Sequence, residues 1–283
     1  MVHTVRRDPH LFGHARHRWT LAMIADQFDW LRGHAPGSVW RLLARLGIGY
    51  KRARDYLHSP DPHYQAKRAW IDEHRARAER QPERFPLLYL DELSYYRQPE
   101  LSWAYEAVGH PQPLARRSYA SNTCFRLVAT LDAITGQVIY LQRSHITTAC
   151  LSDFFAQVQA AYPQAETIAI VLDNWPVHFH PDVLCRLQPQ QLPWPPRLPS
   201  NWPTEPRQKA IRDTLPIQLL CLPTYASWLN PIEKLWRWLK QEVIRLHRCA
   251  DDWPRLKSLV ATFLDRFLNG SSALLRYVGL LPY

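Results

Sequence analysis

The sequence predicts an α/β protein in which a small all-α domain precedes a mixed sheet flanked by helices. Up to residue 80, apolar residues recur at helical spacing in a segment rich in positive charge. From Leu87 onward, short apolar runs that end in polar residues alternate with amphipathic segments. This alternation of expected strands and helices predicts a mixed β-sheet with helices packed on it. The tract Gln81–Pro86 separates the two patterns. The 283 residues, 46% of them hydrophobic, suffice for about two domains.

The N-terminal third has the pattern of a helix-turn-helix or winged-helix-like domain over residues 20–63. One helix is expected from Thr20 to Gly33 and a second over Pro36–Leu46, joined by a short turn that contains glycine. In that motif the second helix enters the major groove, and flanking basic residues contact phosphates. We therefore expect DNA contacts from the cationic residues of the second helix and the loop after it, namely Arg41, Arg45, Lys51, Arg52 and Arg54.

The charge of this region points to a polyanionic partner. The chain carries a net charge of +10, and residues 1–84 hold sixteen Lys and Arg against nine Asp and Glu, so +7 of it lies there. Residues 1–19 are basic, rich in histidine and without periodicity, and we expect them to be a mobile arm. A basic segment is sometimes only a soluble surface, but the asymmetry favours nucleic acid.

The cysteines and the hydropathy of the sequence indicate in which cellular compartment the protein is expected. The five cysteines are an odd number and include no C-x-x-C pair, which argues for reduced thiols and against a disulfide framework or a thiolate zinc site. No secretory signal or run of membrane-spanning length stands out. We expect a soluble, cytoplasmic protein with no membrane partner.

Residues 64–86 are expected to form a helical linker, because the helix Tyr64–Arg80 has only a narrow apolar stripe. A catalytic domain is expected over 87–250 and a helical segment, packed on its sheet, over 251–283. The expected strands are Leu87–Leu90, Arg126–Leu131, Gln137–Leu141, Thr167–Leu172 and Ile217–Leu222, with a hairpin at Asp132–Gly136 and helices over Thr148–Ala161, Pro181–Leu187 and Leu256–Leu268.

Two carboxylates each end an apolar run. Asp91 follows Leu87–Leu90, and Asp173 follows Ile168–Leu172. If these strands are parallel neighbours, both carboxylates emerge at the same C-terminal edge, where open α/β sheets place their sites. Glu92 is one residue further along the strand, so its side chain should point the other way, and a structural role is favoured over metal binding.

A third carboxylate, Glu233, lies at the start of a helix. Asn230 fits the N-cap position, Pro231 the first helical position and Glu233 the third. One interpretation makes Glu233 a capping-box residue that returns a hydrogen bond to the Asn230 backbone. The other groups Glu233 with Asp91 and Asp173 in one acidic site.

Other polar and aromatic residues near these carboxylates have two interpretations each. His178 would contact a scissile phosphate or a carboxylate, or it is a loop histidine at the surface. Tyr225 and Trp228 in the turn before Asn230 would stack on DNA, or they only pack against the protein.

Three stretches resemble the catalytic blocks of DDE transposases. They are Leu-Tyr-Leu-Asp91-Glu92, Val-Leu-Asp173-Asn174-Trp-Pro-Val-His178, and Leu-Pro-Thr-Tyr-Ala-Ser-Trp-Leu-Asn230-Pro-Ile-Glu233-Lys-Leu-Trp. The chain is most similar to the bacterial insertion-sequence branch of the Tc/mariner superfamily. The resemblance covers about residues 85–245, with weaker similarity over 20–70 that includes Ser59-Pro-Asp-Pro. It implies a ribonuclease-H-like mixed five-stranded sheet and cut-and-paste DNA transposition into TA targets. It also implies a prokaryotic host, in which the protein would be associated with the nucleoid.

Carried over to this sequence, the resemblance implies that Asp91, Asp173 and Glu233 hold two Mg²⁺ or Mn²⁺ ions, with Asn174, His178 and Asn230 beside them. Carboxylate oxygens suit such hard cations, and two ions activate a water or a 3′-hydroxyl and stabilise the leaving oxygen. The implied partners are double-stranded DNA, both terminal inverted repeats and target, and a second copy in a homodimer, with no small-molecule substrate.

Two other functions stay open: a ribonuclease-H-like nuclease or integrase that cuts without transposition, and a truncated or domesticated DNA-binding protein without catalysis. The sequence departs from the family in two places. Asp173 and Glu233 are separated by 59 residues, more than the family usually has, and the excess maps to a Pro/Trp-rich insertion over 188–207. There is also room for only one helix-turn-helix unit before Asp91, where relatives generally carry two.

Overall fold

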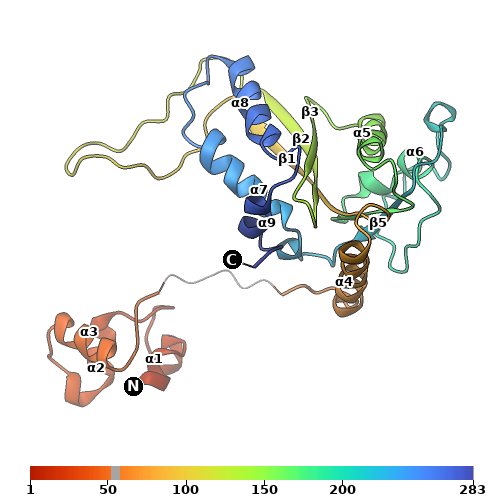
Figure 1. Cartoon of the computed structure of the whole chain (residues 1–283). Coiled ribbons are helices and arrows are strands. Elements are labelled where there is room, and N and C mark those ends of the chain that lie inside the picture. Colours follow the sequence, from red (N-terminus) through yellow and green to blue (C-terminus); the bar gives the residue numbers. More distant parts are fainter. Residues whose placement is uncertain (52–57, 283) are drawn as a thin grey trace. The chain divides into compact units, whose positions relative to one another are not determined.

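The computed structural model describes residues 1–51 and 58–282 and divides into two compact units, Met1–Tyr56 and Leu57–Tyr283 (Figure 1). Arg52 and Arg54 lie outside the described residues. Among the described residues, no helix combines the length and apolarity needed to cross a membrane.

The first unit is helical. It contains α1 (Val2–Val5), the 3₁₀ turns η1 (Pro9–Phe12) and η2 (Asp29–Leu31), α2 (Leu21–Gln27) and α3 (Pro36–Arg45). The two helices expected from the sequence are therefore present. Thr20 Oγ1 caps α2 by accepting from the Met23 backbone N–H at 3.2 Å. The small core comprises Ile24, Ala25, Leu31, Val39 and Leu43.

The first nineteen residues are not the structureless arm that their composition predicts. They form α1 and η1, and Met1, Val5 and Trp19 pack against the small core. Trp19 Nε1 also donates to the Arg7 carbonyl at 2.9 Å. Helices of four residues are too short to produce a periodic apolar pattern, which explains why the sequence concealed them.

The second unit is built on a mixed five-stranded sheet, as predicted, and the order of its strands is β3-β2-β1-β4-β5. β1 pairs antiparallel with β2, and β2 with β3, whereas β1, β4 and β5 are parallel. The strands are β1 (Leu87–Tyr96), β2 (Cys124–Asp132), β3 (Val138–Arg143), β4 (Ile168–Leu172) and β5 (Ile217–Cys221).

β1 is longer than predicted, and this changes the setting of Asp91. The strand pairs with β4 only over Leu87–Tyr89, but with β2 over Leu88–Tyr96. Asp91 therefore lies within β1, just beyond the end of its pairing with β4, and not at the end of the strand. The antiparallel partner continues the ladder, and the buried alternation of Leu93 and Tyr95 continues the strand beyond the acidic pair.

Helices cover both faces of the sheet (Figure 1). One face packs against α4 (Tyr64–Arg80), α7 (Ile232–Leu239), α8 (Trp253–Asp265) and α9 (Ser272–Val278), and the other against α5 (Thr148–Ala161), the 3₁₀ turn η3 (Pro176–Phe179) and α6 (Pro181–Leu184). Further short elements are the 3₁₀ turns η4 (Gln208–Ala210) and η5 (Ser227–Leu229) and a π-helical turn, η6 (Lys240–Ile244).

α4 differs from the expected linker. Its bounds are as predicted, but it belongs to the second unit, and Ile71 and Ala78 are buried in the core beneath it. The division of the chain lies before α4 and not at Gln81–Pro86. A narrow apolar stripe is enough here because polar and aromatic contacts hold α4 as well, among them the Lys67–Asp61 pair and the edge-to-face contact of Trp70 with Trp194.

The Pro/Trp-rich insertion follows shortly after α6 and has no regular secondary structure, as its proline content predicts. α6 ends at Leu184, earlier than expected, because Leu187 forms an isolated bridge with Leu215. Residues 188–207 contain neither helix nor strand, since proline lacks the N–H group that either would require.

Candidate active site

Three carboxylates from distant parts of the sequence line one cleft of about 420 Å³. Asp91 projects from β1, Asp173 directly follows β4, and Glu233 lies in the first turn of α7. The parallel pairing of β1 with β4 brings the first two to the same edge of the sheet. The other lining residues are Asn174, Trp175, Leu222, Pro223, Thr224, Tyr225, Ala226, Ser227 and Asn230.

Asp91 is half-buried and held by a tryptophan of α7. Trp236 Nε1 donates to Asp91 Oδ2 at 2.8 Å. Burial, together with the negative charges of Glu233 and Glu92, raises the pKa of the Asp91 carboxyl to about 7. The cleft therefore concentrates negative charge that a cation would neutralise.

Asn230 and Glu233 do not form the predicted capping box. Asn230 makes no side-chain bond to the start of α7; its Nδ2 donates instead to the Leu90 carbonyl of β1 at 3.1 Å. The N-cap prediction was wrong because Asn230 is buried against β1. Partial burial raises the pKa of the Glu233 carboxyl; Lys240 opposes this rise, and Asp173 adds to it.

Glu92 points away from Asp91, as the strand period predicts. Its Oε1 lies 2.8 Å from Nε2 of His178, which is fully buried on the opposite side of the sheet. Nδ1 of His178 lies 3.6 Å from Asp173 Oδ1. The interpretation of His178 as a surface residue is therefore wrong. Burial alone would lower the pKa of His178, but the carboxylates of Glu92 and Asp173 outweigh burial and raise it.

The donor set fits a hard divalent cation. Potential ligand atoms of Glu92, Asp173 and His178 all lie within 4.8 Å of one another, and Asp91 and Glu233 share the cleft with Asp173. Within the described part of the chain, the buried Oδ1 of Asn230, which also lines the cleft, has no hydrogen-bond partner. Carboxylate and amide oxygens are the ligands that Mg²⁺ and Mn²⁺ prefer.

The turn over one wall of the cleft is held by a segment far away in the sequence. Ser59 Oγ donates to the Thr224 carbonyl at 2.6 Å, and the Thr224 backbone N–H donates to Asp61 Oδ2 at 2.9 Å. Lys67 of α4 pairs with the same Asp61 oxygen at 2.9 Å. The sequence assigned Ser59 and Asp61 to the N-terminal domain and so missed this role, for which a separation of 163 residues leaves no local signal.

The turn itself presents one aromatic residue to the cleft. Tyr225 is 68% exposed and has a positive φ of 55°, which is unusual for a residue with a side chain. Trp228 is not among the lining residues; its Nε1 donates to the Tyr64 hydroxyl at 3.3 Å. Asn174 ties the ends of two strands together, since its Nδ2 donates to the Leu222 carbonyl at 3.0 Å.

Three of the five basic residues that were predicted to contact DNA, namely Arg41, Arg45 and Lys51, lie within the described residues. Arg41 and Arg45 are exposed on α3 and border one hollow together with Ser38, Trp40 and Ala44. Lys51 is exposed and lines a different hollow, which Trp19 also lines. α3 thus presents two cations and the exposed Trp40 on one surface.

The chain is similar to known proteins over most of its length. The family model described as DDE superfamily endonuclease matches residues 86–257. A protein of Shigella sonnei, the insertion element IS630 uncharacterized 39 kDa protein, is 25% identical over 257 residues; the match covers 90% of this chain and 66% of that protein. The chain therefore spans slightly less than two thirds of this curated relative.

Solved structures of the Mos1 mariner transposase share the fold. The Mos1 paired-end complex with Mn superposes with a TM-score of 0.58 at 17% identity, covering 93% of this chain and 71% of that one. The Mos1 strand transfer complex gives a TM-score of 0.57 at 16% identity, covering 98% and 75%. The chain, with its three carboxylates in one cleft, belongs to the DDE superfamily of endonucleases and has the fold of the Tc/mariner transposases.

Proposed function

We propose that this protein is a DNA transposase that cuts a DNA element from its flanks and joins the freed 3′ ends to a TA target. One observation carries the proposal: Asp91, Asp173 and Glu233, from three separate elements, line one cleft at the C-terminal edge of the parallel strands. The membership in the DDE superfamily and the Mos1 complexes with DNA ends support it.

Asp91, Asp173 and Glu233 would hold two Mg²⁺ or Mn²⁺ ions, which supply activation of a water or 3′-hydroxyl and stabilisation of the leaving oxygen. The Mos1 structures with Mn and with Mg support this choice of metal. Two residues outside the cleft lining orient these carboxylates. Trp236 fixes the rotamer of Asp91 through its 2.8 Å hydrogen bond, and the buried His178 stands beside Asp173.

DNA would contact both units. In the first unit, Arg41 and Arg45 on α3 would meet the DNA element's ends, with phosphate contacts from Lys51, Arg52 and Arg54. In the second, Tyr225 would stack on a base beside the scissile phosphate, since it is the exposed aromatic residue that lines the cleft. Trp228, which bonds to Tyr64 instead, would support the turn.

The transposase would act as a homodimer, because two DNA ends must be processed together. The long loop between β1 and β2 supports this, as it projects from the second unit in Figure 1. Six of its large apolar side chains are almost entirely exposed, at 83% or more, which is unusual unless a partner covers them. They are Leu101, Trp103, Tyr105, Val108, Leu114 and Tyr119.

Cleavage of supercoiled plasmid that carries the element's own ends tests the proposal. With Mg²⁺ or Mn²⁺ the wild type should cut at the ends, while Asp173→Asn and Glu233→Gln should bind the DNA without cutting it. Binding without cutting by the wild type in either metal would overturn the proposal in favour of a silent DNA-binding protein. Cutting without joining a pre-cleaved end to a target plasmid would favour a nuclease.

A further inference from the structure

A second cleft, of about 200 Å³, lies between α5, α6 and the residues that follow the Pro/Trp-rich insertion. It is lined by four cationic side chains and only two carboxylates, so its formal charge is positive. The cations are Arg186, Arg207, Lys209 and Arg212, and the carboxylates are Asp153 and Asp182. None of these residues has a part in the three-carboxylate cleft.

One wall of this cleft, the start of α5, lies toward the sheet edge that carries the three carboxylates. Arg143, the last residue of β3, pairs with Arg126 of β2, which pairs with Ser94 of β1, three residues beyond Asp91. α5 begins shortly after β3, so its N-terminus is at that edge. η3 and α6 follow Asp173 and lead away from that edge, because Leu187, the residue after Arg186, forms a bridge with Leu215 just before the start of β5.

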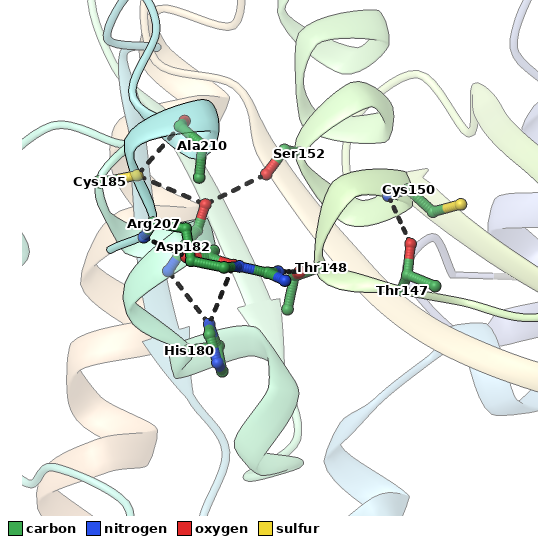
Figure 2. A network of polar contacts seen from close by, with 9 residues as sticks. All are labelled: Thr147, Thr148, Cys150, Ser152, His180, Asp182, Cys185, Arg207 and Ala210. Atoms are coloured by element: carbon green, nitrogen blue, oxygen red, sulfur yellow. Dashed lines mark hydrogen bonds and ion pairs between the residues drawn. The ribbon is translucent and has the colours of Figure 1, made fainter. Parts of the chain in front are cut away.

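Two of the four cations are already neutralised within the protein. Arg207 binds the buried Asp182 through its backbone N–H at 2.8 Å and its Nε at 2.6 Å, and its Nη2 donates to Thr148 Oγ1 at 3.2 Å (Figure 2). Arg212 pairs with Asp153 at 3.4 Å on the surface. The Arg207–Asp182 pair anchors the C-terminal end of the insertion to α5 and α6.

The other two cations have no counter-ion in the described part of the chain. Arg186 is only 6% exposed; its Nε donates to the Asp213 carbonyl at 3.1 Å, and no described carboxylate lies within 4 Å of its guanidinium. Burying a cation without an anion is costly. Lys209 is exposed and makes no described ion pair.

The N-terminus of α5 adds backbone donors to this excess of positive charge. Thr147 Oγ1 already accepts from the Cys150 N–H at 3.2 Å, and the N–H groups of Thr148 and Ala149 have no partner among the described residues. Free N–H groups at the start of a fourteen-residue helix favour anions, and phosphate above all.

We propose that this cleft binds a backbone phosphate of the DNA that enters the three-carboxylate cleft, through Lys209, Arg186 and the start of α5. The proposal rests on the proposed function for the identity of the anion, because DNA that enters the three-carboxylate cleft would extend past the start of α5, which lies toward the same sheet edge. The insertion over 188–207 thereby gains a role. Its last residue, Arg207, holds the chain against Asp182, and this contact places Lys209, two residues further on, at the cleft.

The test measures duplex DNA binding by fluorescence anisotropy over a range of salt concentrations. All variants carry Asp173→Asn, so that cutting does not interfere and the result does not depend on catalysis. Lys209→Gln and Arg186→Gln should each weaken binding several-fold at low salt. Each should also reduce the slope of log affinity against log salt by about 0.9, the value for one lost phosphate contact.

Arg255→Gln is the matched control, because Arg255 is exposed, makes no described ion pair and lies on α8, which packs on the opposite face of the sheet. It removes the same charge and should leave the slope unchanged. Lys209 is exposed, so its variant keeps the fold even if Arg186→Gln unfolds. If Lys209→Gln binds DNA with the same slope as Arg255→Gln, the proposal is overturned.

Inorganic phosphate distinguishes a free anion from DNA. At matched ionic strength, phosphate should compete with DNA for this cleft. It should therefore lower the affinity of the wild-type protein for DNA more than chloride does. If phosphate raises the melting temperature of the wild type but not of Lys209→Gln, while DNA binding is the same for both, then the cleft takes a free phosphate and the assignment to DNA is wrong.

Discussion

Replacing Asp61 with asparagine should destabilise the second unit, because Asp61 joins α4 to the turn that carries Tyr225. The Asp61 and Lys67 side chains are 4% and 6% exposed, and the pair is 2.9 Å long. Burial alone would raise the pKa of Asp61, but hydrogen bonds from Lys67 and from the Thr224 and His63 backbones outweigh burial and lower it from 3.8 to about 2.

The magnitude follows from this shift. Each pKa unit corresponds to about 1.4 kcal/mol, so the interactions of ionised Asp61 contribute roughly 2 to 3 kcal/mol to the free energy of unfolding. Breaking a buried pair by removing one charge costs about 3 to 5 kcal/mol, because the other charge stays buried. We therefore expect Asp61→Asn to lower the free energy of unfolding by about 2 to 4 kcal/mol.

Urea denaturation followed by tryptophan fluorescence is the assay. Asp72→Asn is the matched control, since Asp72 also lies on α4 and pairs with Arg68, but its side chain is 64% exposed. That variant should change the free energy of unfolding by less than about 0.5 kcal/mol. Lys67→Met added to Asp61→Asn should recover much of the loss, because it removes the unpaired charge.

The pH dependence carries a definite sign. Because folding lowers the pKa of Asp61, its contribution is fully present above about pH 4 and disappears as the pH falls through about 2. The difference in stability between wild type and Asp61→Asn should therefore shrink over that range. An Asp61→Asn variant that loses no more stability than Asp72→Asn at neutral pH would refute the reasoning.

Three further predictions concern the site and the dimer. Trp236→Phe removes the hydrogen bond to Asp91 and keeps an aromatic ring, so plasmid cleavage should slow by about tenfold while DNA affinity is unchanged. His178→Ala should weaken Mn²⁺ binding by about 10- to 100-fold in calorimetric titration, because Asp173 loses its buried neighbour. Trp103→Ser with Tyr105→Ser should leave thermal stability within about 0.5 kcal/mol, since both are fully exposed, yet abolish the dimer in sedimentation with DNA ends.

A specific result would contradict each of these three predictions. Cleavage by Trp236→Phe at the wild-type rate would mean that Asp91 needs no partner. Unchanged Mn²⁺ affinity in His178→Ala would show that the histidine has only a structural role. Phe179→Leu, at the next and also buried residue of η3, is the control for changes in packing. A dimer that survives the double serine variant would show that the loop is not the interface.

The sequence by itself determined most of the elements and the three acidic residues. α4 and α5 have the bounds that their apolar periods predicted, and β5 ends at Cys221, one residue before the predicted end. Asp91 and Asp173 follow buried apolar runs, which is a local pattern. Such signals extend over a turn of helix or a few strand residues, so no knowledge of distant contacts is needed to detect them.

Only the tertiary structure decided how these pieces support the site. The partner of Glu92 is 86 residues away, the tryptophan that holds Asp91 is 145 away, and the Asp61 bond to Thr224 spans 163. Asn230 looked like a helix cap because caps are local, but burial against β1 gave its amide a different acceptor. Contacts of this kind depend on which segments the sheet order brings together, and no pattern within one segment encodes that order.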